Sequence, residues 1–411
     1  MAFRFVHTAD IHLDSPLKSL ALRDPALSER VGTATREAFR GIVDLCLREA
    51  VDALLIAGDL YDGSQTSMKT ARFLGSELGR LDAAGIATCI IRGNHDAESR
   101  ITRELVLPPS VTVFGARPGV RRFAAGALEV AVHGISFADA HAPQSLLPRF
   151  GAPVSGALNI GIMHTSLNGA AGHDVYAPCA LADLMASGFA YWALGHVHRR
   201  SVHQGPATVV MPGMPQGRDI GEAGQKSVTL VSVGDDGRIG LEECMTALAQ
   251  FQRVTVQAAG LAEWPALVRA LQQALRQARR DHAAPDLILR PVIEGADALA
   301  WRLARDRDLA LAEAQATGEE IGTVWIDKLE VAGGAGIAPA GTLGELATML
   351  ADPPPAALAE GAEAVEVLVA ALPPALRDRF GSEDTRAALV RTLMAEGAAG
   401  MLALLAGGEG A

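Results

Sequence analysis

Apolar and polar positions alternate along the first 230 residues in a way that predicts strands separated by helices. Short runs rich in Val, Ile, Leu and Ala, bounded by polar or turn-forming residues, are typical of buried strands. Such runs occupy residues 3–10, 52–59, 87–96, 128–136, 157–165, 191–198 and 207–213. Residues 28–50 and 66–84, between the early runs, have the spacing of helices. This alternation predicts a layered α/β fold in which the early strands pair in parallel.

A hairpin and a smaller module follow along the chain. The runs at 226–233 and 239–245 are separated by an Asp-Gly turn, which predicts an antiparallel hairpin. Further strand-like runs at 251–257, 286–295 and 323–331 accompany a helix-like stretch at 264–280 with leucines on one face. This mixture predicts a small α+β module.

The chain therefore divides into four predicted segments. Residues 1–250 form the α/β domain, and 251–331 form the α+β module. A glycine-rich stretch at 332–342 is typical of a linker. Residues 343–411, interrupted by "DPPPAA" and "LPPALRD", predict two or three amphipathic helices.

Composition narrows the class of protein. A chain of 411 residues with 49% hydrophobic positions is long enough for two or three domains with large cores. Neither a signal peptide nor a membrane span is evident, and the four cysteines lie far apart without a CxxC pair. We therefore expect reduced thiols and a cytoplasmic protein with no membrane association. The net charge of −11 neither supports nor excludes a polyanionic substrate.

The strongest chemical signal is that successive apolar runs end in side chains able to bind metal ions. In α/β folds, loops at the carboxyl ends of strands are where ligands are held. One such residue has an ordinary structural explanation, which we give to His133. The residues that share this position are Asp10, His12, Asp59, Asp62, Asn94, His95, Asp96, His164, His196 and His198.

The pair His196 and His198 adds a geometric expectation. Side chains two positions apart in a strand point to the same face, so both imidazoles are expected near one small region. Gly195, directly before them, is expected to leave room for the cluster.

Taken in order, the motifs D-x-H (10–12), G-D-x-x-D (58–62), G-N-H-D (93–96), G-I-M-H (161–164) and G-H-x-H (195–198) resemble the calcineurin-like metallophosphoesterase superfamily. Within it the chain looks most like SbcD-type and YhaO-like bacterial DNA repair exonucleases, through "FVHTADIHLDSPL", "AGDLYDG", "YAPC", "YWALGHVHRR" and "GMPQGRDIGE". This likeness covers about residues 3–235, and residues 251–331 resemble the family's capping domain. The resemblance implies a four-layer β-sandwich flanked by helices, with a smaller α+β capping domain and a helical tail.

The resemblance also implies roles for individual residues. Asp10, His12 and His198 would hold one ion, Asn94, His164 and His196 the other, and Asp59 would bridge the two. Mixed carboxylate, amide and imidazole ligands suit Mn²⁺, with Fe or Zn as alternatives. His95 would assist the leaving oxygen, while Asp62 and Asp96 would orient ligand histidines or their loop. The candidates for substrate contact are Arg92, His173, Tyr176, Arg199, Arg200 and Arg218.

One departure from the resemblance concerns the second motif. SbcD-like relatives carry a histidine three residues after the bridging aspartate, whereas this chain has Asp62, as in the general superfamily pattern. The resemblance to SbcD-like exonucleases therefore does not fix how this chain would carry out the exonuclease step.

The function predicted from the sequence is a two-metal phosphodiesterase, a DNA repair exonuclease that hydrolyses DNA by means of a water activated between the ions. Its implied partners are DNA, a coiled-coil ATPase of the SbcC or YhaN kind docked by residues 343–405, and a second copy of the chain. Two alternatives stay open. One is a phosphoesterase for nucleotides or phosphoproteins, and the other is an inactive scaffold subunit of a repair complex.

Overall fold

The computed structural model describes residues 3–15, 31–61, 67–97, 106–126, 128–169, 176–332, 341–372, 377, 380 and 382–406. Contacts divide the chain into two compact units. The first contains Met1–Gln252 with Ala284–Ile288, and the second contains Arg253–Ala283 with Leu289–Ala411. The predicted module and the predicted tail therefore fall in the same unit.

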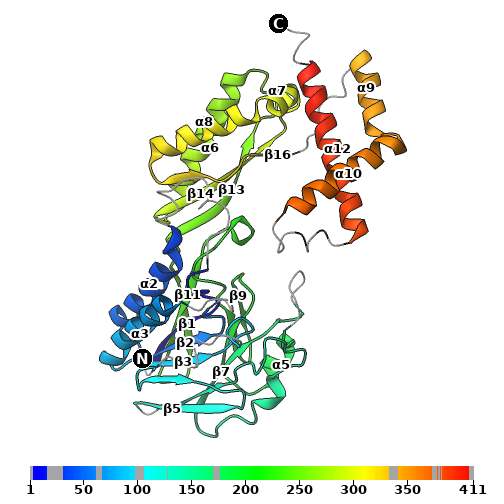
Figure 1. The fold of residues 1–411 in the computed structure, drawn as a ribbon. Coiled ribbons are helices and arrows are strands. Elements are labelled where there is room, and N and C mark those ends of the chain that lie inside the picture. Colours follow the sequence, from blue (N-terminus) through cyan, green and yellow to red (C-terminus); the bar gives the residue numbers. More distant parts are fainter. Residues whose placement is uncertain are drawn as a thin grey trace. The chain divides into compact units, whose positions relative to one another are not determined.

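Two six-stranded sheets form the centre of the first unit (Figure 1). The first sheet has the order β12 (Ile239–Met245), β11 (Ser227–Val233), β1 (Phe3–Thr8), β2 (Ala53–Ala57), β3 (Ala87–Ile91) and β4 (Val111–Val113). The second has the order β5 (Gly119–Ala125), β6 (Leu128–Gly134), β7 (Leu158–His164), β8 (Tyr191–Gly195), β10 (Thr208–Met211) and β9 (Ser201–Gln204). Strands β1 to β4 are parallel, as are β6, β7, β8 and β10.

Helices cover the outer faces of the two sheets. The helices α2 (Ala34–Arg48) and α3 (Met68–Ala83) pack on the first sheet through a core that includes Phe39 and Leu74. A second core fills the space between the sheets. Beyond the second sheet, Trp192 packs in a third core with Leu184 of α5 (Leu181–Ala186) and Leu147 of the 3₁₀ turn η1 (Leu147–Arg149). The predicted α/β architecture, with two sheets between helical layers, is confirmed.

The strand predictions hold best where the run is uniformly apolar. Every residue of β2, β3, β7 and β8 is buried, which is why unbroken apolar runs marked them. The predicted hairpin is confirmed, with β11 antiparallel to β12 and Gly237 at φ +77° in the turn. The strands β4, β5 and β9 were not predicted. In β5 and β9 exposed side chains alternate with partly buried ones, and in β4 all three side chains are only partly buried.

A four-stranded sheet and several helices make up the second unit, except that strands β13 and β14 begin in residues of the first unit. The strands are β13 (Ala249–Gln257), β14 (Asp286–Glu294), β15 (Val324–Ile326) and β16 (Glu330–Val331). The helices are α6 (Trp264–Asp281), α7 (Ala300–Arg305) and α8 (Arg307–Ile321), with the 3₁₀ turn η3 (Asp297–Leu299). Helix α6 buries the predicted leucine face. Helix α8 was not predicted, because its apolar positions are mostly alanines without a clear stripe.

The tail of the second unit is helical, as the sequence predicts. Its helices are α9 (Thr342–Ala351), α10 (Pro355–Ala371) and α12 (Glu383–Ala406). Val365 and Val369 of α10 pack against Val390 of α12. Most of the predicted linker lies outside the described residues. Among the described residues, no helix has the length and apolar character needed to cross a membrane, and all four cysteines are free thiols.

Candidate metal centre

The candidate ligands meet because the carboxyl ends of facing strands in the two sheets approach each other. Asp10, Asp59 and Asn94 follow β1, β2 and β3 of the first sheet, while His164 ends β7 and His196 follows β8 of the second. Parallel strands place all their carboxyl ends at one edge of a sheet, so each sheet presents its ligands along one line.

Gly195 permits this close approach, as the sequence predicts. A Cβ at position 195 would lie 2.0 Å from the carbonyl oxygen of Ala57 and 3.0 Å from Nδ1 of His164. Gly93 is constrained in the same way, since a Cβ there would lie 2.2 Å from Oδ1 of Asp59. The distances of 2.0 Å at Gly195 and 2.2 Å at Gly93 are far below van der Waals contact. Glycine is therefore a steric requirement at these two positions.

Two overlapping groups of donor atoms occupy this region. The first is made of Asp10, His12 and His198, and the second is made of Asp10, Asp59 and His164; within each group the ligand atoms lie within 4.8 Å of one another. Asp10 belongs to both groups. All these side chains are buried except that of His198, which is 24% exposed.

The second group is extended by the remaining candidate ligands. Nε2 of His164 lies 3.1 Å from Oδ1 of Asn94 and 3.3 Å from Oδ2 of Asp59. The imidazole of His196 packs edge-on against that of His164 with ring centroids 5.2 Å apart. The backbone nitrogen of His196 donates to both carboxylate oxygens of Asp10, at 3.1 and 3.0 Å. The structure therefore brings together all seven residues that the sequence assigns to metal binding.

Backbone conformation at the site is unusual. Among the described residues outside glycine, positive φ angles are few, and four of them belong to Asp10 (52°), His12 (46°), Asp59 (52°) and His196 (105°). Asp and His tolerate the left-handed region near +55°, but 105° lies beyond it and has a conformational cost. Such a conformation persists only when surrounding contacts impose it. The backbone bond from His196 to Asp10 is one of those contacts.

His164 has its protonation pattern set by a backbone carbonyl. Its Nδ1 lies 2.9 Å from the oxygen of Ala57, which can only accept a hydrogen bond. Nδ1 therefore carries a proton in both the neutral and the charged ring, and Nε2 is the nitrogen that faces Asn94 and Asp59 and could bind a metal ion. Orientation of a ligand imidazole by a bond at its other nitrogen is a common feature of metal sites.

The pKa values reflect an excess of buried negative charge. Burial lowers the pKa of His164, but the carboxylates of Asp59 and Asp10 reverse this and raise it to about 9. Burial raises the pKa of Asp59, while His164 and the other nearby imidazoles outweigh it and hold that pKa below its usual range. Burial and the neighbouring Asp59 raise the pKa of Asp96 to about 6. The cluster attracts positive charge strongly.

These residues fit divalent cations. The Nε2 atoms of His12 and His198 face each other at 3.3 Å, and Nε2 of His164 faces two oxygens that act as acceptors. Lone pairs that converge in a buried space repel one another unless a proton or a metal ion lies among them. Carboxylate, amide oxygen and imidazole together form a donor set typical of Mn²⁺, Fe or Zn.

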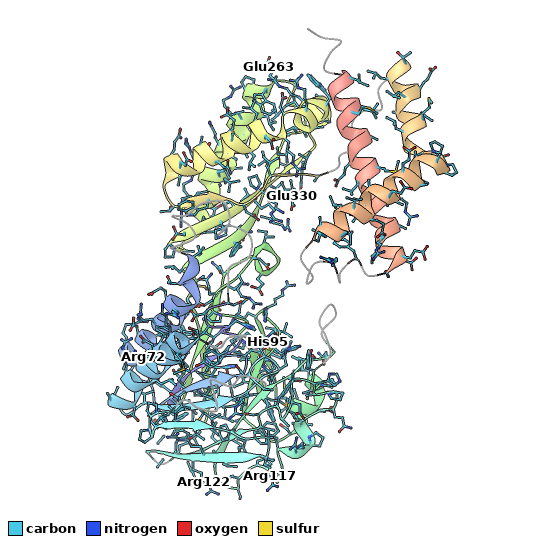
Figure 2. All side chains as sticks on the ribbon, in the orientation of Figure 1. Arg72, His95, Arg117, Arg122, Glu263 and Glu330 are labelled. Carbon is cyan, nitrogen blue, oxygen red and sulfur yellow. The ribbon has the colours of Figure 1, made fainter. Side chains whose placement is uncertain are left out.

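His95 and Asp96 occupy the loop after β3. The side chain of His95, labelled in Figure 2, is exposed. The backbone nitrogen of His95 donates to Oδ1 of Asp59 at 3.0 Å, and its imidazole packs edge-on against that of His12 with centroids 5.0 Å apart. Asp96 accepts from the backbone nitrogens of Leu60, Tyr61 and Gly93 at 3.1, 2.9 and 3.2 Å. Asp96 therefore ties the loop after β2 to the loop after β3. Asp62 lies outside the described residues.

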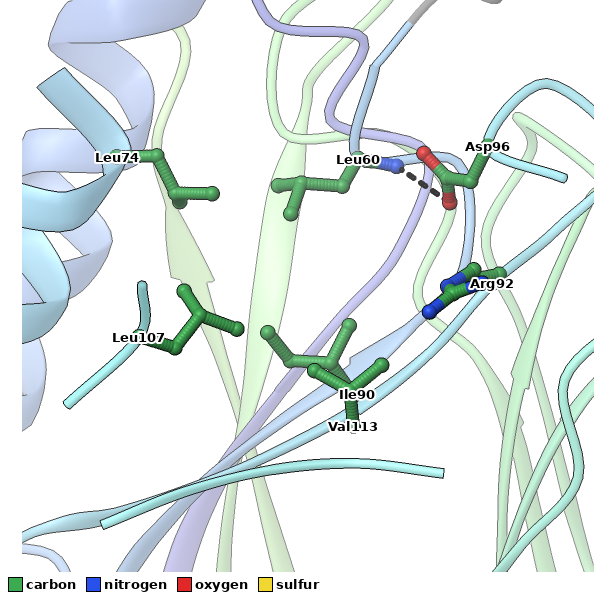
Figure 3. A pocket seen from close by; sticks show the side chains of 7 residues that line it. All are labelled: Leu60, Leu74, Ile90, Arg92, Asp96, Leu107 and Val113. Carbon is green, nitrogen blue, oxygen red and sulfur yellow. Dashed lines mark hydrogen bonds between the residues drawn. The ribbon is translucent and has the colours of Figure 1, made fainter. Parts of the chain in front are cut away.

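The candidates for substrate contact lie at different distances from the cluster. The ring of Tyr176 packs against His196 with centroids 5.4 Å apart. Arg199 is exposed, whereas Arg200 bonds Thr229 at 2.6 Å within the sheet. Arg92 lines a pocket whose other walls are apolar except for Asp96 (Figure 3). His173 lies outside the described residues.

Arg218 and Glu222 form a contact that the sequence analysis did not anticipate. Glu222 lies at the end of the 3₁₀ turn η2 (Ile220–Glu222), and its Oε1 is 2.8 Å from Nδ1 of His198. The guanidinium of Arg218 bonds the same carboxylate at 2.7 Å. Nothing in the spacing connects a glutamate with a histidine 24 positions earlier in the chain. The quoted "GRDIGE" stretch was the only signal available.

The profile of the family described as "Calcineurin-like phosphoesterase" matches residues 3–200, which contain every candidate ligand. Residues 3–200 therefore form a calcineurin-like phosphoesterase region of the chain. A second profile, described as "Metallophosphoesterase YhaO, middle domain", matches residues 251–333. The calcineurin-like phosphoesterase region is thus followed by a region similar to a domain of YhaO.

Curated relatives extend the comparison. The chain is 35% identical over 233 residues to "Uncharacterized metallophosphoesterase YhaO" of Bacillus subtilis, covering 56% of this chain and 57% of that protein. It is 26% identical over 223 residues to "DNA double-strand break repair protein Mre11" of Sulfurisphaera tokodaii, covering 52% and 54%. The matches thus span about half the length of these relatives. A solved dimetal phosphatase from Danio rerio aligns with 60% of this chain and 97% of its own at 14% identity, and the TM-score of 0.40 is too low to add to the assignment.

Proposed function

We propose that this calcineurin-like phosphoesterase is a DNA exonuclease that depends on two divalent metal ions and acts in DNA repair. The observation that carries the proposal is the convergence of two overlapping donor groups at the facing ends of two sheets. Two neighbouring cations are the arrangement that nucleases and phosphatases use to clamp a phosphoryl group. The similarity to proteins named as DNA double-strand break repair proteins supports DNA as the substrate.

In this proposal the seven ligands are shared between two ions. Asp10, His12 and His198 would hold one, and Asn94, His164 and His196 would hold the other, with Asp59 between them. Because Asp10 lies in both donor groups, it would also stand beside the second ion. When bound, the ions supply positive charge that stabilises a phosphoryl group during in-line attack by water. Mn²⁺ is the metal that we propose, since the mixed oxygen and nitrogen donor set suits it.

The chain's own residues would complete the chemistry. His95 is exposed next to the cluster, so its imidazole can reach a leaving oxygen and donate a proton to it. Its backbone bond to Asp59 fixes the loop that carries it. Asp96 keeps that loop attached to the loop after β2. Tyr176 stands beside His196, where it would border the substrate.

Degradation of DNA by the purified full chain tests the proposal. With Mn²⁺, linear duplex DNA labelled at one end should be shortened progressively, and EDTA should abolish the activity. His95→Ala should lower the rate about 10²-fold or more, as loss of a general acid does. Asp59→Asn should abolish metal-dependent activity, while His203→Ala on the strand β9 should leave it unchanged.

The two alternative functions have distinct outcomes in the same experiment. Rapid hydrolysis of nucleotides or phosphopeptides with DNA left intact would replace the exonuclease by a small-substrate phosphoesterase. Tight Mn²⁺ binding without hydrolysis of any of these substrates would identify an inactive scaffold subunit.

We also propose a protein partner for the helical tail, a coiled-coil ATPase of the SbcC or YhaN kind. Its support is the apolar surface of the tail helices, where Met349 is 71%, Val367 is 72% and Leu368 is 53% exposed. A partner helix could cover such a surface. Co-purification with the ATPase should be lost on Val367→Asp, and Glu363→Asp on the same helix is the control. The proposal also includes a homodimer of this chain and a cytoplasmic location. Light scattering of the purified protein tests whether it is a dimer.

A further inference from the structure

His198 differs from His164 in the group that holds its second nitrogen. Oε1 of Glu222 lies 2.8 Å from Nδ1 of His198. An ionised carboxylate can only accept a hydrogen bond, so Nδ1 carries the proton. Nε2 is then the nitrogen left to bind a metal ion, and it lies 3.3 Å from Nε2 of His12 and 4.0 Å from Oδ1 of Asp10. The contact with Glu222 therefore directs the metal-binding nitrogen at the first donor group.

Glu222 is itself fixed in place. Arg218 reaches its carboxylate twice, with the guanidinium at 2.7 Å from Oε1 and the backbone nitrogen at 2.8 Å from Oε2. Only 13% of the Glu222 side chain and 19% of the Arg218 side chain are exposed. The guanidinium of Arg218 pairs directly with this carboxylate and so favours its charged form. The acceptor is thus an anion with little freedom to turn away.

The loop that carries Glu222 is built against the loop that carries His198. Gly213 has φ +75°, and a Cβ there would lie 2.8 Å from the carbonyl oxygen of His198. The backbones of the two loops therefore touch. Gln216 holds the loop from the other side, since its Oε1 accepts from the backbone nitrogen of Leu248 at 2.9 Å. These contacts locate Glu222 without any help from a metal ion.

In the two donor groups, different kinds of acceptor hold the second nitrogen of the histidine. For His164 the acceptor is the backbone carbonyl of Ala57, a neutral dipole that no side-chain substitution removes. For His198 the acceptor is a charged side chain, and a carboxylate makes the imidazole a stronger base than a carbonyl does. The affinity of the first group can therefore be changed separately from that of the second.

We propose that Glu222, held by Arg218, is a positioning residue that fixes the orientation and tautomer of His198 and thereby strengthens binding of one divalent cation by the Asp10, His12 and His198 group. This inference rests on the proposed two-metal function. The sequence motifs place neither residue among the ligands, and neither touches the donor atoms of the second group in the contacts described above.

Mn²⁺ binding to the full chain, measured by calorimetry after EDTA treatment, tests the inference. We expect two ions per wild-type chain. In Glu222→Ala one of the two should bind about 10- to 100-fold more weakly, the range seen when such acceptors are removed. Glu222→Gln keeps an oxygen that accepts from Nδ1, so its loss should be smaller than that of Glu222→Ala. This graded order is a readout that general destabilisation does not produce.

A matched control separates this effect from loss of any buried ion pair. Glu77 is a carboxylate with 7% side-chain exposure, paired with Arg80 at 2.6 Å and Arg40 at 3.4 Å on the helical side of the first unit. Glu77→Gln should leave both Mn²⁺ affinities unchanged. If it weakens them as much as Glu222→Gln does, the inference is wrong.

Histidine ¹⁵N resonances of the metal-free protein give a second readout, with His198 assigned from its absence in His198→Asn. We expect the Nδ1-protonated form in the wild type and a mixture of tautomers in Glu222→Ala, or in Glu222→Gln if the alanine variant does not fold. Unchanged resonances together with unchanged affinity would overturn the inference. Wild-type protein that binds no Mn²⁺ but shows the Nδ1-protonated His198 would instead overturn the proposed function.

Discussion

Acid sensitivity of the first unit should depend strongly on one histidine outside the metal centre. His7 lies on β1 and is fully buried between the two sheets. Its Nε2 is 3.1 Å from the carbonyl oxygen of Leu194, and its Nδ1 is 2.9 Å from the hydroxyl of Tyr191. The carbonyl can only accept, so Nε2 donates and Nδ1 accepts from the tyrosine. Both nitrogens of the neutral ring are therefore used.

A proton added to Nδ1 of His7 would displace the hydrogen bond that Tyr191 donates and would place a positive charge in a fully buried site. Burial lowers its pKa to about 3, with a smaller opposing effect from Leu194 and a further lowering by Arg200. The unfolded chain, with a pKa near 6.5, takes up this proton at a higher pH than the folded chain does. Protonation therefore favours the unfolded state, and stability falls as the pH drops from about 6.5 toward 3. Each pH unit inside that window costs about 1.4 kcal/mol.

From pH 6 to pH 4 the contribution of His7 amounts to about 2 to 2.5 kcal/mol of lost stability. His7→Gln removes the titrating group, so the free energy of unfolding of the first unit should fall less over this interval by about that amount. Its absolute stability at pH 7 is expected to be lower, because the Gln side chain does not satisfy both partners. The slope with pH, and not the intercept, is the quantity that tests the reasoning.

Hydrogen exchange measured by mass spectrometry suits this test, since peptides of β1, β2 and β7 report on the first unit alone. EDTA in all samples removes any contribution from metal ions. His203→Gln, on the partly exposed strand β9, should keep the wild-type slope. Equal slopes in His7→Gln and wild type would refute the assignment of His7 as a neutral buried group.

Two further predictions concern packing. Gly195→Ala should destabilise the first unit by about 3 kcal/mol and weaken Mn²⁺ binding, because the new Cβ would clash with a backbone oxygen. The control is Gly240→Ala, whose Cβ would have its nearest neighbour at 3.8 Å and which should have little effect on either measurement. Arg290→Ala should destabilise the second unit by about 3 to 5 kcal/mol in urea unfolding, because it leaves the carboxylate of Asp327, only 1% exposed, without its guanidinium partner. Arg276→Ala, at a surface pair of the same unit whose side chains are 41% and 63% exposed, is the control, and equal effects of the two arginine variants would contradict this reasoning.

The elements easiest to predict from the sequence were those whose burial is complete along their length. Strands such as β7 and β8 are buried at every position, so their apolar runs need no knowledge of neighbours to be recognised. Helix α8 was missed because its buried positions include Ala310, Ala314 and Gly318, residues that are equally common elsewhere. Small residues pack against the sheet by allowing close approach, as Gly318 does near the oxygen of Val324. Hydrophobic periodicity does not record that kind of contact.

The candidate ligands could be located from the sequence because their positions at strand ends are local, but the grouping of their donor atoms could not. The resemblance gives Asp59 as the shared carboxylate, and among the described donor atoms Asp10 belongs to both groups. Which carboxylate lies between two ions depends on the distance between the sheets, and that distance is set by packing far along the chain. The contact of Glu222 with His198 has the same origin, since it joins two loops that β9 and β10 bring together.

In three of the motifs, the glycine before the candidate ligand allows groups that are distant in the chain to approach the ligand closely. Gly58 stands at φ +92°, and a Cβ there would lie 2.5 Å from Nδ1 of His164, on the opposite sheet. Gly93 and Gly195 face Asp59 and Ala57 at comparably short distances. Each glycine thus makes room for a group that comes from elsewhere in the chain. The motifs "GD", "GN" and "GH" therefore encode two things, a ligand and the absence of a side chain that would keep the sheets apart. Ligands from two sheets can share ions only when both conditions hold, which explains why glycine and ligand occur together at 58–59, 93–94 and 195–196.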